Sequence, residues 1–130
     1  MTDFGSALGV AASGMRTQAD RLRHVSENIA NADTPGYRRK VVAFEALRGP
    51  DAAAGAVATG RVTLDPSPLP QIHDPGHPMA DETGHYLGTN VNLVVEIADA
   101  REAQRSYEAN LRVFDQIRQM SSSLNDLLRR

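Results

Sequence analysis

Three histidines and two aspartates lie close together near the middle of the chain, and they are the side chains best suited to bind a metal ion. They occur in the segment His73-Asp74-Pro75-Gly76-His77-Pro78-Met79-Ala80-Asp81, which is followed by His85. Imidazole and carboxylate groups are common zinc ligands, but this spacing matches no common zinc motif. The two prolines also restrict how the ligands could converge. We therefore favour a turn-rich loop whose aspartate and histidine side chains bond to backbone groups. A metal-dependent enzyme built on His73, His77 and His85 is the alternative, and equilibrium dialysis with zinc would test it.

Basic side chains are a second set that could do chemistry, in this case by binding phosphate groups. A nucleic-acid-binding module would use Arg16, Arg21, Arg23, Arg38, Arg39 and Lys40. The chain has 14 basic and 16 acidic residues and a net charge of -2, and acidic residues are interleaved along both terminal segments. This balance disfavours binding to nucleic acid or to a membrane surface. The sequence has no cysteine, no serine nucleophile motif and no phosphate-binding glycine loop. We predict no enzyme activity, no catalytic or metal-binding residue and no cofactor.

Two long segments at the ends of the chain show the apolar spacing of helices. From Phe4 to Ile29 the apolar residues recur at alternating steps of four and three, interrupted only by Gln18. From Leu93 to Phe114 the same spacing is interrupted only by Gln104, after which the stripe shifts slightly, and Asn92 is a suitable N-cap. Narrow apolar stripes of this kind are typical of coiled coils. The residues predicted to pack along the two stripes are Leu8, Met15, Gln18, Leu22, Val25, Ile29, Ile97, Gln104, Tyr107, Leu111, Phe114, Ile117, Met120, Leu124 and Leu127.

The middle of the chain has a different composition. All seven prolines lie between Pro35 and Pro78. Alternating apolar residues predict short strands near 41–47, 62–64 and 86–87, and small residues predict a loop over 52–60. The first helix should end near Asn28 and Asn31, which tolerate a left-handed conformation. A type II turn at Pro35-Gly36 should follow it.

These elements predict a mainly α fold. Two long terminal helices should pack as an antiparallel, coiled-coil-like hairpin, with a small β-rich and loop-rich insertion between them. The predicted units are an N-terminal helix within 1–34, the insertion at 35–90 and a C-terminal helix within 91–130. Setting the polar interruptions Gln18 and Gln104 opposite each other gives the simplest register, because an apolar interface would leave either amide unsatisfied.

Several motifs resemble those of the bacterial flagellar axial proteins, which form the rod and hook. The first is Asn28-Ile29-Ala30-Asn31 followed by Thr34-Pro35-Gly36-Tyr37-Arg38-Arg39. The segment Asp74 to Asp81, the pair Asn90 and Asn92, and Arg105-Ser106-Tyr107-Glu108-Ala109-Asn110 resemble more specifically the rod protein C family. The residues that carry the resemblance are Asn28, Asn31, Pro35, Gly36, Tyr37, Arg38, Asp74, Pro75, His77, Pro78, Asp81, Asn90, Asn92, Tyr107 and Asn110. Another small axial rod subunit, such as rod protein B, is the alternative.

The resemblance implies a structural subunit of the proximal rod that transmits motor torque to the hook and filament. It also implies export by the flagellar type III apparatus without a cleaved signal peptide, and axial assembly within the periplasm, with no direct membrane insertion. The implied partners are further copies of the chain, rod proteins B and F, the distal rod protein G and the hook–basal body complex protein E.

Overall fold

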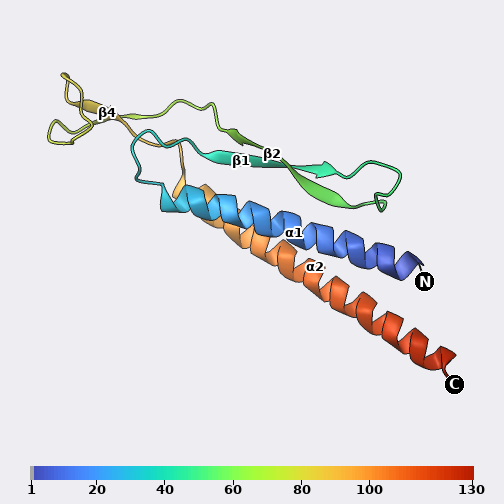
Figure 1. The fold of residues 1–130 in the computed structure, drawn as a ribbon. Helices are drawn as coiled ribbons and strands as arrows, with labels where there is room; N and C mark the ends of the chain where they lie inside the picture. The colour runs from blue at the N-terminus through green and yellow to red at the C-terminus, as the bar shows by residue number, and fades with distance from the viewer. Residues whose placement is uncertain (1) are drawn as a thin grey trace.

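Two long antiparallel helices form the body of the protein, and two small β-hairpins lie between them in the sequence. The computed structural model describes residues 2–130. Helix α1 spans Thr2–Ala30 and helix α2 spans Leu93–Leu128, and Figure 1 shows both chain termini at the same end of the molecule. The strands are β1 (Lys40–Ala46), β2 (Val57–Leu64), β3 (Gln71–His73) and β4 (His85–Leu87). The predicted mainly α hairpin with a β-rich insertion is confirmed.

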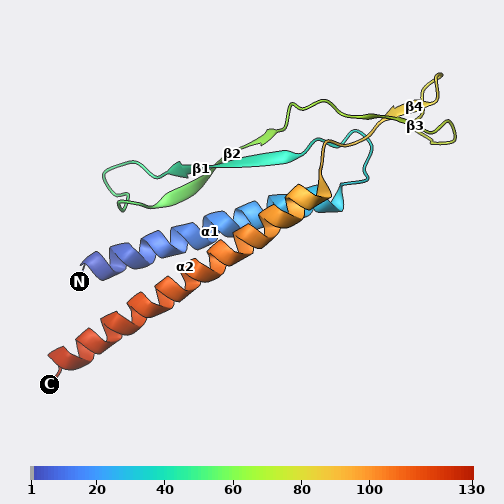
Figure 2. The same cartoon turned by 180° about the vertical axis from the view of Figure 1, so that it is seen from behind.

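The β1–β2 hairpin lies along α1, as Figure 2 shows from behind. The two strands pair antiparallel with a bulge between Val42 and Phe44, and β3 pairs with β4 in a separate two-stranded sheet. The predicted strands are confirmed, but the predicted loop over 52–60 is wrong at its end. Residues from Val57 onward belong to β2. This part of β2 forms hydrogen bonds with α1, and the small side chains of the segment give no sign of these bonds in the sequence. The Val57 amide donates to the Ser13 hydroxyl (3.1 Å), and the Thr59 hydroxyl donates to Asp20 (2.8 Å).

The predicted turn after α1 is confirmed, whereas the predicted left-handed asparagines are wrong. The Tyr37 amide donates to the Thr34 carbonyl (3.2 Å), and Gly36 between them has a positive φ of 76°. Among residues 2–130, only glycines have positive φ. Asn31 instead stays near the helix by donating its side-chain amide to the Glu27 carbonyl (2.8 Å). At the other helix, Asn92 is the N-cap as predicted, and its side chain accepts from the Val94 and Val95 amides.

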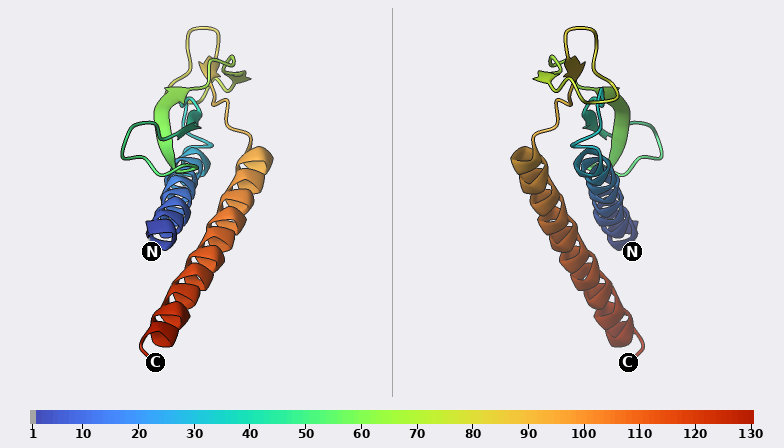
Figure 3. Two further views of the ribbon diagram at one scale, coloured as in Figure 1. Left: turned by 90° about the vertical axis from the view of Figure 1, so that its right-hand side faces the viewer. Right: turned by 90° about the vertical axis from the view of Figure 1, so that its left-hand side faces the viewer.

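Helix α1 is the central element, and little large apolar surface is buried around it. Both α2 and the β1–β2 hairpin contact α1, and α2 contacts no other helix or strand within residues 2–130. The buried apolar residues in the described chain are small: Ala11, Val25, Ala56 and Ala103. Figure 3 shows α2 running beside α1 with the rest of its surface uncovered by other elements. No helix among residues 2–130 is long and apolar enough to cross a membrane.

Candidate assembly site: the helical hairpin and its junction

The contact between α1 and α2 is made by small and polar residues. Ala103 is completely buried, and Asn110 lies so close to Gly14 that an added Cβ at position 14 would be 2.9 Å from its Nδ2 atom. The Asn110 amide is held by a hydrogen bond to the Ser106 carbonyl (3.0 Å). Near the start of α1, Ala7 and Ile117 line one groove. Helix α1 therefore approaches α2 through a glycine and an alanine and does not use a row of leucines.

Asn28 joins the hairpin to the insertion. The residue is 1% exposed, and its Oδ1 atom accepts from the Tyr37 hydroxyl and from the Lys40 amide, both at 2.9 Å. Its Nδ2 atom donates to the Lys40 carbonyl (3.0 Å) and to Glu96 (3.3 Å). The Asn28 side chain thus bonds both the backbone N–H and the carbonyl of Lys40, the first residue of β1, and it also bonds Glu96 of α2. Burial raises the pKa of the Tyr37 phenol, which keeps it protonated as the donor.

An ion-pair cluster with one buried carboxylate surrounds this junction. Glu96, on the first turn of α2, is completely buried and pairs with the Arg39 guanidinium. Arg39 also bonds Asp99 at 3.1 Å and lies 3.8 Å from Asp65. Burial lowers the pKa of Arg39, but the hydrogen bond to Glu96 and the three carboxylates outweigh it and raise the pKa overall. The cluster fixes the start of α2 against the entry to β1, because a buried carboxylate is strongly destabilising without its partner.

Further ion pairs occupy most of the basic residues that a nucleic-acid site would need. Arg21 lies 3.4 Å from both Asp99 and Glu102, and Lys40 lies 2.6 Å from Glu27. The hydrogen bond between Lys40 and Glu27 lowers the pKa of Glu27 and raises the pKa of Lys40. Arg38 donates to two backbone carbonyls of the insertion. These groups are arranged to join the elements to each other, which argues against a phosphate-binding surface.

Asn90 closes the insertion where the chain returns to α2. Its Oδ1 atom accepts from the Arg39 amide (2.7 Å), and its Nδ2 atom donates to the carbonyls of Asp65 and Ser67. The outgoing and returning chain segments are therefore held together by one side chain. Asn28, Tyr37, Arg38 and Asn90 all carry the family resemblance, and the structure brings them together at this junction.

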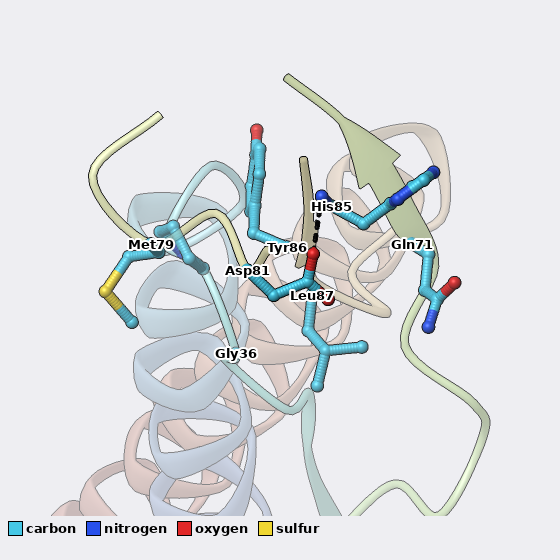
Figure 4. Close-up of a pocket in the computed structure, with 8 residues that line it drawn as sticks. Gly36, Gln71, Met79, Asp81, His85, Tyr86 and Leu87 are labelled. Atoms are coloured by element: carbon cyan, nitrogen blue, oxygen red, sulfur yellow. Dashed lines mark hydrogen bonds between the residues drawn. The ribbon is translucent and has the colours of Figure 1, made fainter. Parts of the chain in front are cut away.

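The histidine-rich loop is organised by hydrogen bonds and ring contacts. Asp81 accepts from the Thr83 amide (2.8 Å), the Thr83 hydroxyl (2.6 Å) and the His85 amide (3.0 Å), the last of which is drawn in Figure 4. These bonds lower the pKa of Asp81, chiefly through the Thr83 hydroxyl. His77 stacks on Tyr86 with ring centroids 3.9 Å apart. His73 meets His85 edge-on at 4.7 Å.

The remaining motif residues of this loop also have packing roles. Asp74 accepts from the Gly76 amide (3.2 Å), and Pro75 lies against Gly84, where an added Cβ would be 2.9 Å from the proline ring. Among residues 2–130, no group of three or more histidine and acidic side chains is placed to hold a metal ion. The loop therefore has the turn-stabilising bonds that its aspartates and histidines predict.

Gln18 and Gln104, which the simplest register sets opposite each other, line one groove, but much of the apolar stripe of α2 is turned away from α1. Leu93, Ile97 and Leu111 are exposed, whereas Glu96, Ala103 and Asn110 face α1. Apolar periodicity missed this face because its residues are small or polar and are held by hydrogen bonds. Gln18 and Gln104 do line one groove together, yet they form no hydrogen bond with each other, and Gln18 Oε1 is buried without a partner.

The stripe residues differ in how far the chain itself buries them. Val25 is buried, and seven residues are half-buried: Leu8, Met15, Gln18, Leu22, Ile29, Phe114 and Ile117. The exposed stripe residues are Ile97, Gln104, Tyr107, Leu111, Met120, Leu124 and Leu127. Since α2 contacts only α1 among the described elements, these apolar side chains form a surface that the chain itself leaves open.

Sequence reasoning missed several residues of the junction. Glu96, Asp99 and Gly14 belong neither to the predicted apolar stripes nor to the motifs that carry the family resemblance. The sequence contains one signal for this ion pair. Glu96 lies one helical turn after the N-cap Asn92, and Arg39 lies near the start of the insertion, so a carboxylate and a guanidinium are available at the two points where the insertion joins the helices. Which arginine pairs with which carboxylate depends on how the insertion folds back, and the helical pattern does not contain that information.

Comparison with known proteins identifies the family. Residues 8–38 match the family model described as flagella basal body rod protein, and residues 82–127 match the model for the C-terminal part of the flagellar basal body rod FlgEFG proteins. The flagellar basal-body rod protein FlgC of Agrobacterium fabrum is 43% identical over 136 residues, which cover 99% of this chain and 98% of the relative. The chain belongs to the FlgC family.

Other FlgC proteins show the same relationship at greater distance. That of Escherichia coli O6:H1 is 34% identical over 117 residues, covering 85% of this chain and 87% of the relative. That of Aquifex aeolicus is 35% identical over 119 residues, covering 88% and 89% respectively. The resemblance to rod protein C is thereby confirmed, and the alternative of rod protein B is not favoured.

Proposed function

We propose that this member of the FlgC family is a structural subunit of the flagellar basal-body rod that assembles through the outer faces of its two terminal helices. The proposal rests on one observation: several polar and small side chains lie between the two helices, and many large apolar side chains are exposed, which is the opposite of the usual arrangement in a globular protein. Glu96, Ala103 and Asn110 of α2 face α1, whereas leucine, isoleucine and tyrosine side chains of α2 are exposed. Burying each such side chain contributes roughly 1.5 to 3 kcal/mol, so neighbouring subunits gain much by covering them.

In this proposal the hairpin, drawn from residues 1–34 and 91–130, forms the inner wall of the shaft, and residues 35–90 lie on its outside. The β1–β2 hairpin of the insertion packs against α1, and the insertion reaches α2 through the ion pairs of Arg39 with Glu96 and Asp99. The Asn28 and Glu96 bonds make the insertion and the hairpin turn together, as a part that carries torque requires.

The partners follow from family membership at the level of other rod and hook–basal body proteins. We further propose contacts with copies of the chain itself, with rod proteins B and F, with the distal rod protein G and with the hook–basal body complex protein E. The location is the flagellar basal body, and we propose assembly in the periplasm after export by the type III apparatus without a cleaved signal. The relatives are structural rod proteins, which supports a role without catalysis.

Two matched substitutions test this function. Leu111 on α2 and Val62 on β2 are both 40% exposed, so neither substitution should unfold the free chain. Leu111→Asp places a charge in the proposed inner wall, where burial without a partner costs several kcal/mol, and we expect loss of rod assembly and motility. Val62→Asp lies on the insertion and should leave motility intact. Swimming in soft agar and the presence of each variant in purified basal bodies would be measured. Equal motility of the two variants would contradict the proposed role of the helical faces.

A further inference from the structure

Two histidines face each other across the β3–β4 hairpin. His73 and His85 are directly opposite in the register of the two strands, and their ring centroids lie 4.7 Å apart. The neighbouring pair carries a ladder hydrogen bond, from the Asp74 amide to the Gly84 carbonyl (2.9 Å). In an antiparallel ladder such pairs alternate with non-hydrogen-bonded pairs, in which the side chains come closer together. His73 and His85 form a pair of the second kind, so the backbone itself brings the two imidazoles together.

Hydrogen bonds determine which ring nitrogen of His85 is free. The Thr83 hydroxyl lies 3.0 Å from His85 Nδ1, and it donates its one hydrogen to the Asp81 carboxylate at 2.6 Å. An ionised carboxylate can only accept, so the hydroxyl has no hydrogen left for the ring and His85 Nδ1–H must be the donor. The neutral ring therefore has a free lone pair on Nε2. Histidines that bind metal ions are commonly oriented in this way, by a hydrogen bond from the other ring nitrogen.

The His73 ring can turn toward the same point. His73 is exposed, and rotation of a histidine ring about χ2 is a soft motion. Its Nε2 atom lies beside Gly84, where an added Cβ would be 3.3 Å away. Because position 84 has no side chain, this nitrogen remains accessible to a ligand.

The spacing of the two rings is that of ligands to one metal ion. A metal bound to a ring nitrogen at about 2.0 to 2.1 Å lies roughly 3.2 Å from the ring centroid. Two rings bound to one ion then have centroids about 4.5 Å apart when the two bonds are at right angles, and about 5.2 Å apart when the angle is tetrahedral. The observed 4.7 Å is closer to the right-angled value. Nitrogen ligands at right angles are typical of tetragonal copper(II) and nickel(II), whereas zinc prefers a tetrahedron.

His77 is turned away from this pair. Consecutive strand residues point to opposite faces of a sheet, so Tyr86 and His85 lie on opposite faces, as Figure 4 shows. The His77 ring stacks on Tyr86. Its Nδ1 atom accepts from the Met79 amide (3.1 Å), so the neutral ring carries its proton on Nε2 and has no free lone pair for a metal. The three-histidine site considered from the sequence is therefore reduced to a pair.

We propose that His73 and His85 bind one divalent transition-metal ion, copper(II) most tightly, and that the ion joins β3 to β4. Copper(II) forms the strongest complexes with nitrogen ligands among the first-row divalent ions. The site has two protein ligands and is completed by water, so it binds more weakly than a structural zinc site with four. Both strands have only three residues, and an isolated two-stranded hairpin is marginally stable at best. An ion that binds only the paired strands therefore stabilises the hairpin.

Titration of the purified full-length chain with copper(II) chloride tests the site, in a preparation without a polyhistidine tag. Isothermal titration calorimetry at pH 7 should give one ion per chain. We expect His73→Gln and His85→Gln each to weaken binding by at least roughly tenfold, because each removes one of two ligands that the hairpin holds at high effective concentration. His77→Gln is the matched control from the same loop, and it should bind copper like the wild type.

A second measurement needs no substitution. Copper(II) is paramagnetic and broadens the NMR signals of nearby protons. At a small fraction of one equivalent, the ring signals of His73 and His85 should broaden before those of His24, which lies on α1. The electron paramagnetic resonance spectrum of the complex should show two nitrogen ligands.

Four results would overturn the site: no copper binding by the wild type, unchanged binding in His73→Gln or His85→Gln, equal weakening by His77→Gln, or first broadening at His24. Each is measured on the free chain, so none of them bears on whether the chain assembles into a rod.

Discussion

Replacing Asn28 by alanine should weaken the attachment of the insertion to the hairpin. The side chain makes four hydrogen bonds, two with the Lys40 backbone and one each with Tyr37 and Glu96. Asn28→Ala removes all four and leaves the Lys40 amide without its partner. Glu96 retains Arg39 but loses its second donor.

The expected magnitude follows from these bonds. A typical intramolecular hydrogen bond contributes about 0.5 to 1.5 kcal/mol net, and a bond to a charged group contributes about 1.5 to 3 kcal/mol. Tyr37 and Lys40 are only half-buried, so water replaces part of what they lose. Alanine also favours the helix by a few tenths of a kcal/mol relative to asparagine. We expect a net loss of about 3 kcal/mol from the free energy of unfolding.

Urea unfolding followed by circular dichroism at pH 7 would measure this loss. At roughly 1 to 2 kcal/mol per molar urea, the midpoint should fall by more than 1 M or the variant should be unfolded without urea. Hydrogen exchange at the Lys40 amide should accelerate at the same time. Asn125→Ala is the matched control, because Asn125 is exposed on α2 and its side chain makes no hydrogen bond to the described chain. A loss below about 1 kcal/mol for Asn28→Ala, or an equal loss in the control, would refute the argued role of Asn28.

Three further substitutions test other parts of the fold. Gly9→Ala should stabilise α1 by up to about 1 kcal/mol because nothing lies within 4 Å of the added Cβ, and thermal unfolding would show a raised Tm. Gly14→Ala should show no such gain, since Asn110 must move away, and equal gains at both positions would contradict the close helix approach. The lowered pKa of Asp81 means that its carboxylate stabilises the β3–β4 hairpin above the unfolded pKa of about 3.9, and that this contribution is lost as the pH falls through the lower folded value. NMR shifts of the Thr83 and His85 amides should follow this titration, and Asp81→Asn should abolish it; persistence of the titration in that variant would assign it to another group.

Local signals were sufficient to predict the elements. The four-and-three spacing of apolar residues marks both helices, Asn92 marks the start of α2, and Pro35-Gly36 marks the turn that follows α1. Alternation marks β1 and β2, although the start of β2 at Val57 depends on Ser13 of α1 and was placed too late. The motifs were sufficient to predict the family.

Which faces of the helices meet was not predictable in the same way. Periodicity identifies the apolar side of a helix, and burial of that side within the chain is the usual outcome for a globular domain. Here the chain buries Ala103 and Glu96 and exposes Ile97 and Leu111. The hydrogen bonds that reverse the usual arrangement join residues far apart in sequence, such as Asn28 and Glu96, and only the folded chain shows which of these polar residues meet.

The small size of the buried apolar residues has a thermodynamic consequence. Three alanines and one valine make up the buried apolar set of the described chain. The heat-capacity change of unfolding is set largely by newly exposed apolar area, at about 0.45 cal/mol/K for each Å². The free subunit, which has little such area to expose, should unfold with a small heat-capacity change for its length. Its stability then varies little with temperature, and its calorimetric transition is broad. Assembly, which covers the leucines of α2, should supply the large negative heat-capacity change that folding of the single chain does not.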